Sequence, residues 1–325
     1  MTSLNKKYII VSGATATGKT ATSIRIAQYI KTLDKKAEII NFDSLLFYKE
    51  LNIGTAKPSI SEMKGITHHL VSSASITDPV NASNFVMRAK KIISTLFKKE
   101  VIPILVGGSA FYVRALIKGM IESEEELSKN FDTKELNRII GSPTLTTDYL
   151  SLHDPEILKM FHANDLYRRG RAIEFHFINK KKYSEKLYEV KQNRPYDFSH
   201  NSKIQGEMLH IYLELEKSKH LDIMEKRVKE MIKNGLIEEV KKLLEQGFGP
   251  ELKPLASIGY KETINFVERD SALSTDDLIE NIFISTRQLA KSQKTFFKKI
   301  TPKIQIDPTS DQLDLFKAVE DFIRP

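Results

Sequence analysis

The fold of this chain is decided by residues 8–20, which read YIIVSGATATGKT. The first part is an apolar, β-branched run that predicts a buried strand. The second part matches G-x-x-x-x-G-K-T, the pattern of a phosphate-binding loop. Residues 21–30 then place apolar side chains at a helical spacing. Strand, loop and helix N-terminus together form a socket whose backbone N–H groups and helix dipole point at phosphate groups.

Two side chains of this loop add specific chemistry. The Lys19 ammonium supplies a positive charge for a phosphate group, and the Thr20 hydroxyl is the expected ligand of a magnesium ion. The loop residues expected to contact the phosphates are Gly13, Ala14, Thr15, Ala16, Thr17, Gly18, Lys19 and Thr20.

The composition is that of a soluble globular protein, with 325 residues of which 41% are hydrophobic and 28% charged. No apolar run approaches the roughly 20 residues of a membrane helix, and residues 1–7 leave no room for a signal peptide. We therefore expect a cytoplasmic protein without membrane association. The absence of cysteine excludes disulfides and thiolate metal sites, and the net charge of +8 favours an anionic partner.

Polar or small residues follow two further predicted strands. Residues 37–42 end at Asp43, and ligands of open α/β sheets bind beyond the carboxyl ends of the strands, so Asp43 is expected to face the phosphate loop. The alternative is a loop aspartate that caps the following segment through Ser44. Residues 101–106 end at Gly107-Gly108-Ser109, where P-loop ATPases and kinases often carry a magnesium-handling aspartate. The absence of this aspartate argues against a kinase.

A shift in composition divides the chain into an α/β core and an all-helical insertion. Residues 1–120 and 196–325 form the core, a P-loop NTPase-like parallel sheet flanked by helices, and the second part returns with the last strands and the C-terminal helices. Residues 121–195 contain no convincing strand and form the insertion. Within residues 164–194, basic and aromatic side chains are interleaved, which fits nucleic-acid contact and equally fits a solvated helix with a buried aromatic stripe.

A second basic feature lies on the predicted helix 278–300. Four cations at a spacing of i, i+4, i+7 and i+11 share one face of this helix: Arg287, Lys291, Lys294 and Lys298. No acidic residue lies between positions 286 and 303. A stripe of one sign favours contact with a phosphate backbone, and a solvated face is the alternative.

These residues resemble the tRNA dimethylallyltransferases, also called tRNA isopentenyltransferases or the IPP transferase family. The resemblance spans nearly the whole chain. Besides the phosphate loop, it is carried by Asp43-Ser44, Ile53-Gly54-Thr55-Ala56-Lys57-Pro58, His68-His69-Leu70, Val106-Gly107-Gly108-Ser109 with Tyr112, the segment His162 to Glu174, Arg227, Gly259-Tyr260-Lys261-Glu262, and Arg287-Gln288-Leu289-Ala290-Lys291 with Gln293.

The resemblance implies transfer of a dimethylallyl group from dimethylallyl diphosphate to N6 of adenosine 37, beside the tRNA anticodon, with Mg²⁺ as cofactor. It implies that Asp43 is the general base, that Ser109 bonds base and phosphate, and that Lys19, Thr20 and Arg227 hold the diphosphate. The adenine must be flipped out of its stack to react. A monomer is expected. The residues expected to contact the anticodon arm are Asp43, Ser44, Leu45, Leu46, Ser109, Arg168, Arg171, Arg287, Lys291, Gln293 and Lys294.

The sequence departs from the family pattern at several positions. Leu46 stands where the family has a glutamine that touches the tRNA bases. Lys217 and Ile223 replace two arginines of the diphosphate site. Ala14 replaces a loop proline, and Ser292 replaces an arginine. These departures bear on turnover and tRNA selectivity rather than on the fold.

Two other functions are compatible with the residues. The first is a P-loop kinase acting on a nucleotide or another small molecule, which would consume ATP. The second is a tRNA-binding relative that has lost catalysis, which Leu46 and Ile223 motivate. The presence of Lys19, Thr20 and Asp43 favours an active transferase over this relative.

Overall fold

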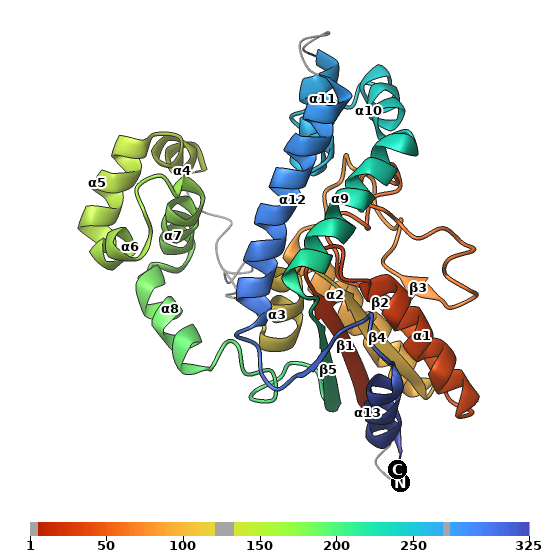
Figure 1. Ribbon diagram of the computed structural model, residues 1–325. Helices are drawn as coiled ribbons and strands as arrows, with labels where there is room; N and C mark the ends of the chain where they lie inside the picture. Colours follow the sequence, from red (N-terminus) through yellow and green to blue (C-terminus); the bar gives the residue numbers. More distant parts are fainter. Residues whose placement is uncertain (1–5, 121–132, 269–273, 325) are drawn as a thin grey trace. The chain divides into compact units, whose positions relative to one another are not determined.

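The computed structural model describes residues 6–120, 133–268 and 274–324 (Figure 1). The chain divides into two compact units, one combining Met1–Lys118 with Ser202–Pro325 and the other comprising Gly119–Asn201. The sequence predicts these boundaries at 120/121 and 195/196. The first part of the predicted insertion, residues 121–132, lies outside the described residues.

The larger unit is built on a parallel sheet with the strand order β3-β2-β4-β1-β5-β6. Its strands are β1 (Lys7–Gly13), β2 (Lys36–Asn41), β3 (His68–His69), β4 (Val101–Gly107), β5 (Glu207–Leu213) and β6 (Ile304–Ile306). In the interior strand β1, Ile9 is in register with Ile104 of β4 and with Leu209 of β5. The predicted α/β fold with a parallel, helix-flanked sheet is confirmed.

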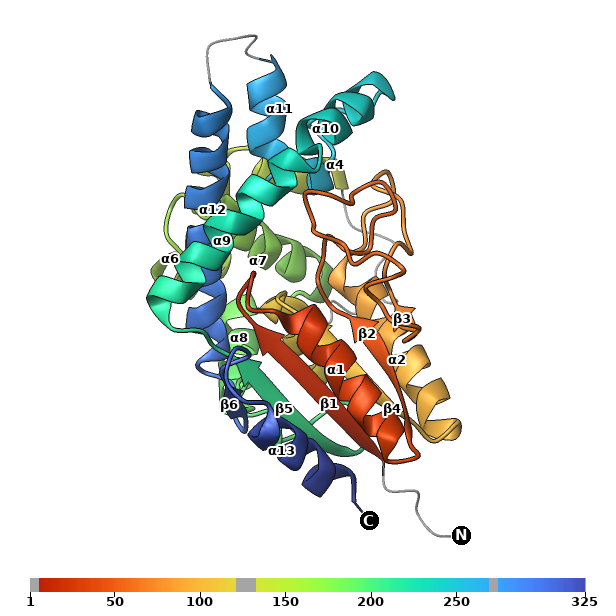
Figure 2. The same ribbon diagram turned by 45° about the vertical axis from the view of Figure 1, so that its right-hand side comes forward.

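Both faces of the sheet are covered, which explains why β1 is apolar along most of its length. On one face, α1 (Lys19–Thr32) and α13 (Leu313–Ile323) share a hydrophobic core with Ile9 and Val11 (Figure 2). Successive strand residues face opposite sides, so Ile10 is buried by the other layer, where α2 (Ala82–Lys98) packs against β4 and α3 (Ala110–Lys118) packs against α2.

A second hydrophobic core of this unit is mainly helical. It is formed by α9 (Lys217–Lys233), α10 (Leu236–Glu245), the short 3-10 helix η1 (Lys253–Ala256), α11 (Tyr260–Glu268) and α12 (Thr275–Phe297). Tyr48, Leu51 and Ile76 from the long connections after β2 and β3 are buried in the same core. Gly235 separates α9 from α10 with a φ of 96°, a left-handed conformation that favours glycine.

The smaller unit is a bundle of short helices. They are α4 (Thr133–Ile140), α5 (Pro143–His153), α6 (Pro155–Met160), α7 (Leu166–Asn179) and α8 (Tyr183–Gln192). Pro143 and Pro155 open α5 and α6, where the missing N–H group of proline is tolerated, so each proline marks the start of a new helix. Its core contains Leu150, Ile157 and Ile173. Across the described parts of both units, no helix combines the length and apolarity needed to span a membrane.

Candidate active site

The phosphate loop connects β1 to α1 through a left-handed residue. Gly18 is the N-cap of α1 with a φ of 77°, so the chain turns sharply and the helix begins at Lys19. The loop is braced internally, because the Thr17 hydroxyl donates to the Ala14 carbonyl oxygen at 2.9 Å. The Lys19 ammonium donates to the same oxygen at 2.7 Å. This lysine therefore lies folded over its own loop, within reach of a bound phosphate.

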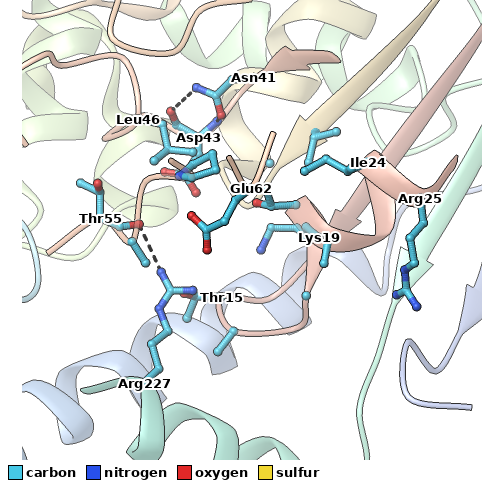
Figure 3. A pocket seen from close by; sticks show the side chains of 18 of the residues that line it. Thr15, Lys19, Ile24, Arg25, Asn41, Asp43, Leu46, Thr55, Glu62 and Arg227 are labelled. Carbon is cyan, nitrogen blue, oxygen red and sulfur yellow. Dashed lines mark hydrogen bonds between the residues drawn. The ribbon is translucent and has the colours of Figure 1, made fainter. Parts of the chain in front are cut away.

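A cavity of about 670 Å³ opens beside this loop (Figure 3). Lys19 and Thr20 from α1, Asp43 and Leu46 from the segment after β2, and Arg227 from α9 all line it. The structure thus brings together residues that the sequence selected from three separate segments. Ser44, Leu45 and Ser109 are not among its lining residues, although Ser109 bonds to the segment that bears Asp43.

The position of Asp43 is fixed by its neighbours in the chain. The side chain of Asn41 accepts from the Asp43 N–H at 2.9 Å and donates to the Asp43 carbonyl at 3.0 Å. Asp43 Oδ1 also accepts from the Leu45 N–H, at 3.3 Å. The two alternatives considered for Asp43 are therefore compatible, because its carboxylate caps the next turn and also lines the cavity.

The glycine at the end of β4 allows the close approach of the segment that carries Asp43. A Cβ atom on Gly107 would lie 2.5 Å from the Phe42 ring and 2.8 Å from the Asp43 nitrogen. Two residues later, the Ser109 hydroxyl accepts from the Ser44 N–H at 3.1 Å and lies 3.4 Å from the Ser44 hydroxyl. Ser109 therefore ties the end of β4 to the residue next to Asp43.

Arg227 is positioned by a loop that a network of hydrogen bonds supports. Its guanidinium donates to the Thr55 carbonyl at 3.3 Å (Figure 3). The loop before Thr55 is held by the Glu239 carboxylate, which accepts from the N–H groups of residues 52, 53 and 54 at 3.0–3.3 Å. Tyr260 donates its hydroxyl to the same carboxylate at 2.7 Å. Two of the sequence segments singled out above, 53–58 and 259–262, thus meet at Glu239, which the sequence analysis missed.

The charges around the cavity favour an anion. Burial lowers the pKa of Lys19 to about 8, Asp43 opposes this shift, and the nearby Arg227 adds to it. Burial also lowers the pKa of Arg227, and Asp43 again opposes the shift. The cavity lining carries four cationic side chains, Lys19, Arg25, Lys64 and Arg227, against the carboxylates of Asp43 and Glu62. A phosphate-bearing ligand would compensate the remaining positive charge.

Comparisons with known proteins agree with this geometry. The sequence profile of the family described as IPP transferase matches residues 46–300. A tRNA dimethylallyltransferase 1 of Pelobacter propionicus is 34% identical over 296 residues, which cover 90% of this chain and 89% of the relative. The chain belongs to the IPP transferase family. This confirms the family predicted from the sequence.

Other relatives and solved structures of the IPP transferases match over similar lengths. The tRNA dimethylallyltransferase of Staphylococcus haemolyticus is 34% identical, over 92% of this chain and 86% of its own. A tRNA isopentenylpyrophosphate transferase from Staphylococcus epidermidis superposes with a TM-score of 0.67 at 28% identity, covering 98% and 99% of the two chains. A eukaryotic dimethylallyltransferase acting on tRNA superposes with a TM-score of 0.81 at 26% identity, covering 98% and 80%.

The oxygen-bearing side chains around the cavity of this IPP transferase fit a magnesium site that is completed by the phosphates of a ligand. The Thr20 hydroxyl and the carboxylates of Asp43 and Glu62 line the same space. The described residues contain no cluster of three or more His, Cys, Asp or Glu side chains arranged for a metal. Mg²⁺ is commonly held by one or two carboxylates together with substrate phosphates. These residues therefore suit an ion that the ligand's phosphates complete, rather than a cage made by the protein alone.

Glu62 is a second cavity residue that the sequence analysis missed. Its carboxylate accepts from the N–H and the hydroxyl of Ser59, at 2.7 and 2.8 Å, which lowers the pKa of Glu62. The side chain points into the cavity from the loop after Pro58 (Figure 3). The only signal for it was its position just after the family segment 53–58, because a glutamate in a polar loop has no distinctive pattern.

The basic stripe of α12 is divided by an acid from another strand. Glu214, directly after β5, lies 3.1 Å from the Lys294 ammonium and 3.7 Å from that of Lys298. Arg287 and Lys291 are exposed, and the Arg287 guanidinium lies over the Phe283 ring. No acid lies in the sequence of the stripe, but in three dimensions Glu214 pairs with its last two lysines.

The basic residues of α7 also differ in their roles. Arg168 and Arg171 are exposed and pair with Asp165 and Glu174 on the same helix. Arg169 is buried, with its guanidinium donating to the Phe161 carbonyl at 3.0 Å. Arg169 therefore stabilises the interior of the helical unit.

Proposed function

We propose that this protein transfers a dimethylallyl group from dimethylallyl diphosphate to N6 of adenosine 37 in tRNA. The observation that carries the proposal is that Lys19, Arg227 and Asp43 line one cavity beside a phosphate loop. Relatives of this chain over most of its length are tRNA dimethylallyltransferases, which supports the choice of donor and acceptor.

In the proposed reaction, the exocyclic amine attacks C1 of the dimethylallyl group. A C–N bond forms, the C1–O bond breaks with its electron pair passing to the diphosphate, and the Asp43 carboxylate accepts the amine proton. Lys19 and Arg227 neutralise the charge that develops on the leaving diphosphate. Thr20, with Asp43 or Glu62, would hold a magnesium ion together with the phosphates of the donor, and that ion would add to the neutralisation of charge on the diphosphate.

The tRNA side of the proposal rests on exposed cations. Arg287 and Lys291 on α12, and Arg168 and Arg171 on α7, are exposed and suited to phosphate contact. Leu46 lines the cavity and would face the bases beside the flipped adenine. Ser109, which bonds Ser44, would reach base and phosphate after a change of hydrogen-bond partner.

The direct test is mass spectrometry of nucleosides from unmodified tRNA incubated with the protein, Mg²⁺ and dimethylallyl diphosphate. We expect the nucleosides to include N6-dimethylallyladenosine. Nuclease mapping of the tRNA should place the modified adenosine at position 37 and at no other position. Binding of tRNA without any prenylated nucleoside would support the non-catalytic relative. Hydrolysis or transfer of the ATP γ-phosphate in place of prenyl transfer would support the kinase.

Reversing the two exposed charges on α12 should weaken tRNA binding. We expect the Arg287→Glu/Lys291→Glu double variant to raise the Kd for tRNA at least about tenfold. Each lost phosphate contact should also flatten the salt dependence, by about 0.7 to 0.9 in the slope of log K against log salt. Filter binding over a range of salt concentrations measures both quantities.

The matched control for this pair is Lys31→Glu/Lys317→Glu. These two exposed lysines lie on α1 and α13, and their reversal changes the net charge by the same amount. Equal weakening by both double variants would mean that only net charge matters. If the Arg287→Glu/Lys291→Glu variant keeps the wild-type slope of log K against log salt, this face of α12 is solvated and does not contact tRNA phosphates.

Restoring a polar side chain at position 46 should improve use of tRNA. Because Leu46 lines the cavity, Leu46→Gln places an amide where the flanking bases would lie. One additional hydrogen bond predicts an increase in kcat/KM for tRNA of about 2- to 10-fold, without a change in donor affinity. Steady-state kinetics with each substrate varied in turn measures this. Leu313→Gln, at an exposed leucine of α13, is the control and should give no gain.

A further inference from the structure

One residue of the phosphate loop, Thr15, is held through its backbone N–H and its backbone carbonyl by side chains of two helices that are distant in sequence. The Gln293 Oε1 atom on α12 accepts from the Thr15 N–H at 2.7 Å. On α9, the His220 Nε2 atom lies 2.9 Å from the Thr15 carbonyl oxygen, so this nitrogen carries the hydrogen and donates it. Gln293 Nε2 in turn donates to the Gly108 carbonyl at 2.9 Å. The loop is thereby linked to α9, α12 and the residue after β4.

The Gln293 amide is satisfied inside the protein at both ends. Its oxygen meets an N–H group and its nitrogen meets a carbonyl, which fixes the orientation of the amide. The space beside Gly108 is also filled, since a Cβ atom there would lie 2.7 Å from Gln293 Nε2. His220 is 4% exposed. These contacts differ from what the family resemblance implies for Gln293, which is contact with tRNA.

We propose that Gln293 and His220 are positioning residues that hold the phosphate loop in the shape that binds the diphosphate. The backbone N–H groups of such a loop bind phosphate well only when they already converge before the ligand arrives. The two hydrogen bonds fix the peptide groups before and after the Thr15 Cα atom, and they thereby restrain the backbone between Gly13 and Lys19. The proposal deepens the proposed function, and its primary readout is diphosphate binding rather than turnover.

The central test measures the affinity of the full chain for inorganic pyrophosphate by calorimetry, with Mg²⁺ present. Gln293→Met keeps the length of the side chain and removes both hydrogen bonds. We expect the Kd for pyrophosphate to rise about tenfold, the effect of losing two ordinary hydrogen bonds. The Kd for tRNA should stay within about twofold of the wild-type value. Gln288→Met, the same substitution at an exposed position of α12, should leave pyrophosphate affinity unchanged.

Variants at two further positions, Gly108 and His220, separate positioning from a loss of folding. Gly108→Ala leaves Gln293 in place but displaces its amide, so it should weaken pyrophosphate binding in the same direction. His220→Leu should also weaken it, whereas His220→Gln, which can still donate to the Thr15 carbonyl, should restore most of the affinity. A purely space-filling role for His220 would make the leucine and glutamine variants alike and would overturn its part in the proposal.

The outcomes distinguish this proposal from the proposed function. If Gln293→Met binds pyrophosphate with wild-type affinity, the positioning role is wrong. If the same variant also binds tRNA more weakly, Gln293 is a tRNA contact. If the wild-type protein binds pyrophosphate and produces no prenylated nucleoside, the proposed function fails. The loss of pyrophosphate affinity in Gln293→Met would still support the positioning role in that case.

Discussion

Replacing Asp43 by asparagine is expected to lower kcat for dimethylallyl transfer by about 100-fold or more. The exocyclic amine of adenine is a weak nucleophile, because its lone pair is delocalised into the ring. Its attack becomes easier when a carboxylate accepts the proton as the C–N bond forms. Asparagine keeps the side-chain oxygen that accepts from the Leu45 N–H, so the local turn should survive while the basicity is lost.

Single-turnover measurements with saturating donor and tRNA give the rate of the chemical step for this variant. Direct binding of tRNA and dimethylallyl diphosphate to the same variant should remain near the wild-type level. Asp34→Asn, at an exposed carboxylate after α1, is the control and should be fully active. If the chemical rate of Asp43→Asn is preserved and only binding suffers, Asp43 positions the substrates and another group accepts the proton.

Replacing Lys19 by alanine is expected to lower kcat/KM for the donor by about 100- to 1,000-fold. The ammonium lies in the cavity, where it would neutralise charge on the departing diphosphate. Because burial lowers its pKa to about 8, the wild-type protein should bind pyrophosphate best below that pH. Affinity should fall as the pH rises through about 8 and the charge is lost. The Lys19→Ala variant should not show this fall in pyrophosphate affinity with rising pH.

Calorimetry of pyrophosphate binding in two buffers of different ionisation enthalpy tests the same assignment. Near pH 8 the wild-type protein should take up protons on binding, because the ligand favours the charged form of Lys19. Lys31→Ala, an exposed lysine of the same helix, should behave as wild type. Equal proton uptake by Lys19→Ala would show that another group titrates. Near-normal kcat/KM in that variant would remove the phosphate loop from the mechanism.

The sequence by itself determined the local elements and the edge of the sheet that carries the site. The strand, loop and helix of residues 8–30 follow from a contiguous pattern of apolar residues, glycines and helical spacing. Asp43 could be placed near the phosphate loop because parallel strands present their carboxyl ends at one edge. Such inferences need only the residues of one segment and a general rule of chain topology.

Only the tertiary structure decided which side chains support these elements. The two partners of the Thr15 backbone lie 205 and 278 residues further along the chain, and the partner of Lys294 is a strand-end glutamate. Glu239 holds the loop that positions Arg227 across a similar separation. A hydrogen bond or an ion pair depends on atoms meeting within about 3 to 4 Å, and residues so far apart in sequence meet at that distance only after the sheet and its covering helices have packed.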